Sequence, residues 1–86
     1  MSRLTVACID LEHLAHNARA IRAHLAAVRG PSAPSLVGVV KADAYGHGAV
    51  PVARTLVDSG AATLACADID EGLELRAAGL EVPILV

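Results

Sequence analysis

Lys41 is the residue of this 86-residue chain whose type and position best suit covalent chemistry. It is the only lysine beside six arginines, and it directly follows the apolar run Leu36–Val40. A guanidinium stays protonated in proteins, whereas an amine can lose its proton when desolvated and can then attack a carbonyl to form a Schiff base. Tyr45, the only aromatic residue, lies four residues further on. The two side chains mark one strand-to-loop junction as the candidate site.

A solvated charge at a turn and a tyrosine packed in a core would be the simpler interpretation of Lys41 and Tyr45. The surrounding sequence favours a site, because parallel strands of α/β proteins carry functional residues at their carboxyl ends. Gly46 and Gly48 would let the main chain approach a bound group closely, although two ordinary turn glycines explain them nearly as well. For His47 we expect a hydrogen bond that stabilises the loop. The alternative, that His47 tunes residues that bind a ligand, is given less weight.

Strand and helix patterns alternate on both sides of this junction. We expect strands at 4–9, 36–40, 63–67 and 83–86, the second of them buried on both faces. The first helix should begin after the N-cap Asp10 and end at Gly30 and Pro31; the next should hold Pro51 in its first turn and end at Gly60. A capping box of Asp68 and Glu71 should start the third helix, which Gly79 ends. Such spacing indicates parallel crossover units, in an open doubly wound sheet or in a barrel wall.

Each expected helix has an apolar stripe that should face the sheet. The stripes comprise Leu11, Leu14, Ala18, Ile21, Leu25 and Val28 in the first helix, Val52, Ala53, Leu56 and Val57 in the second, and Leu73, Ala77 and Leu80 in the third.

The segment VVKADAYGHG, residues 39–48, resembles the cofactor-attachment motif of the alanine racemases. These are pyridoxal-phosphate enzymes with a (β/α)8 barrel followed by a β domain. The resemblance covers nearly all of the chain, from Ile9–Leu11 to Pro83–Val86. It departs at Val6 and Cys8, where the family often has an aromatic and an acidic residue, and at Gly72, where alanine is common.

The resemblance implies an α/β fold in which the chain is the N-terminal portion of a (β/α)8 TIM-type barrel. Because such a barrel takes about 250 residues, residues 1–86 would be an N-terminal fragment of the pyridoxal-phosphate-binding domain, inactive alone. Lys41 would carry pyridoxal 5'-phosphate as an internal aldimine and serve as the base on the D face of alanine. Tyr45 would contact the cofactor phosphate. The family's second base, a tyrosine from the partner subunit, has no counterpart in this chain.

The implied function is the interconversion of L-alanine and D-alanine, which supplies D-alanine for peptidoglycan, in a cytoplasmic homodimer. Two alternatives remain open. One is a broader-specificity racemase or another barrel-type pyridoxal-phosphate enzyme, such as a decarboxylase. The other is a non-catalytic piece in which Lys41 and the loop glycines hold a phosphate, although no nucleotide-binding glycine motif is present.

Composition argues against several other classes of function. A net charge of −2 with scattered arginines gives no support for nucleic-acid binding. We expect neither export nor a membrane span, because no basic segment precedes an apolar stretch and no run of about 18 apolar residues occurs. Cys8 and Cys66 lack a C-x-x-C spacing and are interpreted as small buried apolar residues. His13 and His16 have ligand-like spacing without a third ligand, so no metal is expected.

Overall fold

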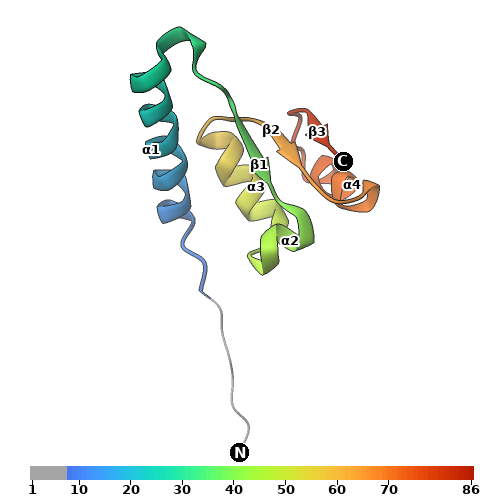
Figure 1. The fold of residues 1–86 in the computed structure, drawn as a ribbon. Coiled ribbons are helices and arrows are strands. Elements are labelled where there is room, and N and C mark those ends of the chain that lie inside the picture. Colours follow the sequence, from blue (N-terminus) through green and yellow to red (C-terminus); the bar gives the residue numbers. More distant parts are fainter. Residues whose placement is uncertain (1–7) are drawn as a thin grey trace, which may run out of the picture.

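A computed structural model describes residues 8–86, which form a parallel sheet with helices packed against it (Figure 1). The strands are β1 (Leu36–Val39), β2 (Ala61–Ala65) and β3 (Ile84–Leu85), in the order β1-β2-β3. The helices are α1 (Leu11–Arg29), α2 (Lys41–Gly46), α3 (Ala49–Asp58) and α4 (Ile69–Ala77), with a 3-10 turn, η1 (Gly30–Ser32), after α1. The strand expected at 4–9 falls largely outside the described residues, and Cys8 and Ile9 are not in a strand.

Both strand pairs are parallel, as the alternation of strands and helices predicts. Val37 pairs with Thr63 between β1 and β2, and Leu64 pairs with Ile84 between β2 and β3. The helices α3 and α4 connect successive strands, so the chain is built of βα units whose strand carboxyl ends share one edge of the sheet.

The expected capping residues start and end the helices. The Asp10 side chain accepts a hydrogen bond from the His13 amide before α1, and the Asp68 side chain accepts one from the Glu71 amide before α4. Gly30, at the end of α1, and Gly79, just after the Ala78 cap of α4, have φ of 57° and 88°, which side chains disfavour. These helix ends were therefore predictable from local chemistry.

The core lies between the sheet and the helices α3 and α4. Leu64 of β2 and Leu75 of α4 are almost completely buried, together with Val40, Ala53 and other small residues. A Cβ at Gly38 of β1 would lie 3.0 Å from Leu56 Cδ1 and 3.1 Å from Leu64 Cδ2. The missing side chain thus allows α3 to pack close to β1.

Several expectations of burial are wrong for residues 8–86. Val37 and Val39 are exposed, because helices cover only one face of the sheet and these residues point to the other. In α1, Ile21 and Val28 are exposed, since this helix packs mainly on α3 rather than along the sheet. Cys8 is exposed, whereas Cys66 is buried as expected.

The third helical stripe and the third strand also differ from expectation. Leu73 is exposed, and the buried residues of α4 are Gly72 and Leu75. Strand β2 ends at Ala65, two residues before the expected end, because the Ala67 amide binds the Glu71 side chain instead of continuing the ladder. None of the helices in residues 8–86 combines the length and the hydropathy that a membrane span needs.

Candidate active site at the end of β1

Lys41 lies at the carboxyl end of β1, the position expected for a functional residue. The amide of the preceding Val40 still pairs with the Ala65 carbonyl at 2.9 Å, so the sheet holds the chain up to that point. Lys41 itself is exposed. The only ion pair within residues 8–86 joins His13 to Asp10, which leaves the Lys41 amine without a carboxylate partner in that range.

The segment labelled α2, Lys41–Gly46, is not an ordinary right-handed helix but a left-handed turn. Ala42, Asp43, Ala44 and Tyr45 have φ between 53° and 57° and ψ between 36° and 49°. For a residue other than glycine this conformation costs about 1–2 kcal/mol, because Cβ crowds the following carbonyl oxygen. Strain of this kind persists only where surrounding contacts hold it, and it is common at functional sites.

Hydrogen bonds within the segment hold the turn from both sides. The Ala44 amide donates to the Val40 carbonyl at 2.9 Å, and the Gly48 amide donates to the Asp43 carbonyl at 2.8 Å. Asp43 Oδ1 accepts from the Ala49 amide at 2.8 Å. The expected glycines contribute as well, because Gly46 and Gly48 have φ of 84° and 93°.

His47 stabilises this turn, as expected. Its Nδ1 lies 3.0 Å from the Ala44 carbonyl oxygen and 3.1 Å from the Tyr45 carbonyl oxygen. Because a carbonyl oxygen can only accept, Nδ1 must carry the proton. The His47 ring is therefore fixed by the main chain of the turn.

Tyr45, the last residue of the left-handed turn, is 59% exposed. It does not pack into the core, so the simpler interpretation of a lone buried tyrosine is wrong. An apolar hollow of about 240 Å³ lies beside it, lined by Ile9, Leu14, Val39, Ala44, Tyr45, His47, Val52 and Leu56. Lys41 and Tyr45 are thus both accessible, on one short segment at the end of one strand.

Glu71, expected only as part of a capping box, also contacts this segment. Its Oε2 accepts a hydrogen bond of 2.8 Å from the amide of Ala42, the residue after Lys41. The sequence predicts its capping role through the spacing from Asp68, but it carries no signal for the second contact. The left-handed turn was missed for a similar reason, since only Asp43 belongs to a residue type that favours positive φ.

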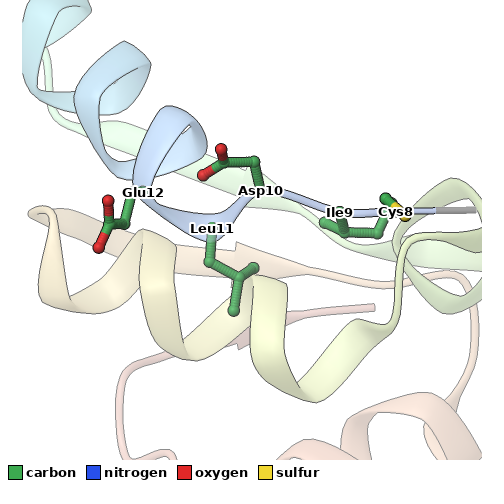
Figure 2. Close-up of a pocket in the computed structure, with 5 residues that line it drawn as sticks. All are labelled: Cys8, Ile9, Asp10, Leu11 and Glu12. Atoms are coloured by element: carbon green, nitrogen blue, oxygen red, sulfur yellow. The ribbon is translucent and has the colours of Figure 1, made fainter.

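A larger surface hollow, of about 530 Å³, lies at the start of α1 (Figure 2). It is lined by the consecutive residues 8–12, whose side chains point in different directions along the chain. Neither Lys41 nor Tyr45 is among the residues that line this hollow. This hollow therefore does not compete with the end of β1 as a candidate site.

Comparison with known proteins agrees with the resemblance. Residues 9–86 match the family model described as the alanine racemase N-terminal domain. The alanine racemase of Sorangium cellulosum is 49% identical over 84 residues, which cover 98% of this chain and 21% of that protein. The chain therefore belongs to the alanine racemase family.

Solved structures of the family share the fold. Alanine racemase from Bacillus anthracis, described with bound L-Ala-P, matches with a TM-score of 0.81 and 42% identity over 91% of this chain and 19% of that one. Alanine racemase from Streptomyces lavendulae matches with a TM-score of 0.77 and 49% identity over 88% of this chain and 18% of that one. The expected fold is confirmed: parallel βα units that form part of a (β/α)8 barrel. The chain spans about a fifth of the length of its relatives.

Proposed function

We propose that this chain is the N-terminal part of the barrel domain of a pyridoxal-phosphate-dependent alanine racemase, which interconverts L-alanine and D-alanine. The observation that carries the proposal is the placement of Lys41. In a chain of the alanine racemase family, the only lysine is exposed at the carboxyl end of β1 and opens a strained left-handed turn.

The residues at this strand end fit pyridoxal phosphate by their chemistry. The group carries an aldehyde and a phosphate, and Lys41 supplies an accessible primary amine while Tyr45 supplies an accessible hydroxyl. Lys41 would hold the group covalently, and Tyr45 would contact its phosphate. When bound, pyridoxal phosphate supplies a conjugated ring that accommodates the negative charge left on the α-carbon.

Lys41 would also act as the base on one face of the substrate. Once its amine is free, Lys41 would remove the α-proton of D-alanine, and in the opposite direction of the reaction it would donate a proton to that same face. The base for the L face would come from a tyrosine of a partner subunit, so the active form would be a homodimer. The L-Ala-P bound to the relative from Bacillus anthracis supports alanine as the substrate class. Supply of D-alanine for peptidoglycan in the cytoplasm remains a prediction that goes with this activity.

Reductive labelling tests the proposal directly. The protein expressed from its own gene is incubated with pyridoxal phosphate, reduced with borohydride and digested for peptide mass mapping. We expect the pyridoxyl group on Lys41, and exchange of the α-proton of alanine with solvent deuterium before reduction. Labelling spread over other amines, with none enriched at Lys41, would contradict the assignment. Serine and lysine as substrates would then separate an alanine-specific enzyme from a broader racemase.

A further inference from the structure

The Glu71 carboxylate connects the ends of two neighbouring strands. Its Oε1 accepts a hydrogen bond of 2.6 Å from the Ala67 amide, beyond the end of β2. Its Oε2 accepts one of 2.8 Å from the Ala42 amide, beyond the end of β1. The carboxyl ends of parallel neighbours lie at the same edge of a sheet. One side chain of α4 therefore spans the edge from which Lys41 projects.

Helix capping alone does not account for this arrangement. In a capping box, the glutamate binds the amide of the N-cap residue, which here is Asp68. Glu71 instead binds the amide one residue earlier, and its second oxygen leaves the helix to reach a segment 29 residues away in sequence. The contact with Ala42 is thus a tertiary contact, in addition to any capping of α4.

A carboxylate is the side chain that suits two donors at once. It accepts through both oxygens and has no hydrogen to donate, whereas a glutamine amide offers one oxygen and one NH2 group. Ala42 is the first residue of the left-handed turn. As at the start of any helix, its amide has no carbonyl acceptor within the turn. Glu71 satisfies this amide from outside the turn.

Glu71 is itself held in place by α4. The Asp68 side chain accepts a hydrogen bond from the Glu71 amide at 2.9 Å. The next residue, Gly72, is buried, and a Cβ added to it would lie 3.6 Å from Cys66 Sγ. Glu71 as a whole residue is half-buried. It therefore offers Ala42 a fixed anchor.

We propose that Glu71 is a positioning residue for Lys41. Ala42 is the first of the four strained residues and is bonded directly to Lys41. By holding the Ala42 amide, Glu71 fixes the peptide that joins Lys41 to the turn and so sets the direction in which the lysine leaves β1. This inference rests on the proposed role of Lys41, and the test below separates the two.

The test compares four variants of the protein expressed from its own gene. Glu71→Ala removes both acceptor oxygens, and Glu71→Gln keeps one. Glu74→Ala is the matched control, because Glu74 is an exposed carboxylate on the same helix. Asp68→Ala removes the N-cap of α4 and the acceptor of the Glu71 amide but keeps both Glu71 oxygens, and so reports what a loosened helix start does.

The first measurement is hydrogen exchange of a peptide that contains Ala42, without cofactor. We expect exchange there to rise about tenfold in Glu71→Ala, as for loss of a hydrogen bond to a charged group, and by less in Glu71→Gln. Glu74→Ala should match the unsubstituted protein. Asp68→Ala should speed exchange in α4 and should raise exchange in residues 41–48 by less than Glu71→Ala does.

The second measurement is the visible circular dichroism of the cofactor held by Lys41, expressed per bound cofactor. We expect this signal to fall by about half or more in Glu71→Ala, since a lysine held less firmly exposes the cofactor to a less defined chiral surrounding. Glu71→Gln should recover part of this signal, and Asp68→Ala should lose less of it than Glu71→Ala does.

Two results would overturn the proposal. One is that hydrogen exchange at Ala42 is as slow in Glu71→Ala as in the unsubstituted protein. The other is that the circular dichroism signal falls equally in Asp68→Ala and Glu71→Ala. If Lys41 takes no label in the unsubstituted protein, the proposed function fails instead. Exchange at Ala42 would in that case still decide whether Glu71 holds the turn.

Discussion

The carboxylate of Asp43 accepts a hydrogen bond of 2.8 Å from the amide of Ala49, the first residue of α3. The residue before α3 is Gly48, which has no side chain to cap the helix. Asp43 thus caps α3 from six residues upstream, within the left-handed turn. The turn that follows Lys41 and the helix that follows the turn consequently stabilise each other, which helps to offset the strain of four residues with positive φ.

Replacing Asp43 tests this coupling. We expect Asp43→Ala to lower the local stability of the first turn of α3 by about 1 kcal/mol, as for loss of other N-cap side chains. Asp43→Asn should lose less, because its carbonyl oxygen can still accept from Ala49. Hydrogen exchange of residues 49–53 measures the effect. Asp58→Ala, at the other end of α3, is the control, and an equal loss in that variant would argue against a specific contact.

Lys41→Arg should abolish covalent attachment of pyridoxal phosphate while it keeps the positive charge. A guanidinium does not condense with an aldehyde as an amine does, and arginine stays protonated at every pH of interest. Borohydride reduction followed by peptide mapping should find no pyridoxyl group on the peptide that spans position 41. Arg54→Lys, on the exposed side of α3, is a matched control that adds a lysine away from the site. Labelling of the added lysine equal to that of Lys41 would show that exposure alone explains the reaction.

A glycine at position 42 should relieve strain. Ala42 has φ of 53°, which an L side chain disfavours by about 1–2 kcal/mol, whereas the added backbone entropy of glycine costs about 0.5–1 kcal/mol. Ala42→Gly should therefore be neutral or stabilise the turn by up to about 1.5 kcal/mol. Ala20→Gly, at an exposed right-handed position in α1, should instead lose about 1 kcal/mol. Hydrogen exchange in the two segments gives the comparison, and equal losses would mean that Ala42 is not strained.

Local chemistry in the sequence predicted much of this fold. Helix starts and ends were predictable because Asp10, Asp68, Gly30 and Gly79 act on their nearest neighbours. The parallel arrangement followed from the spacing of strands and helices. The position of Lys41 at a strand end was predictable because the apolar run stops there.

Features that depend on distant neighbours were not predictable. Ala42 carries no sign of positive φ in the sequence, because the acceptor that holds its amide is Glu71, 29 residues away. Val37 and Val39 have the composition of a buried strand, yet their exposure depends on what covers that face of the sheet. A sequence pattern indicates which burial and backbone conformation a residue favours, whereas its contacts in the fold determine which ones it adopts.

Gly72→Ala should stabilise α4. A Cβ at Gly72 would lie 3.6 Å from Cys66 Sγ and 3.9 Å from Ile84 Cγ2, which is ordinary contact, so the added methyl has room. Alanine in a helix interior is favoured over glycine by about 1 kcal/mol. Gly38→Ala is the contrasting variant, since its Cβ would lie 3.0 Å from Leu56 Cδ1, and overpacking costs about 1–3 kcal/mol. Opposite changes in the hydrogen exchange of α4 and β1 are expected; a loss in Gly72→Ala would mean that the site lacks this space.

The 86-residue chain, produced alone, should neither racemise alanine nor remain a stable monomer. Strand β1 pairs with a neighbour on one side only within residues 8–86, and Val37, Val39 and Leu85 leave an apolar surface exposed on the sheet. An open edge beside such a surface favours association with other chains. In the proposed mechanism Lys41 would be the base for only one face of the substrate, so proton transfer on the other face would depend on residues outside this chain. Sedimentation and the conversion of L-alanine to D-alanine with added pyridoxal phosphate measure both properties, with the protein expressed from its own gene as the reference. A cooperative monomer with measurable turnover would show that these 86 residues need neither a closed barrel nor a partner's base.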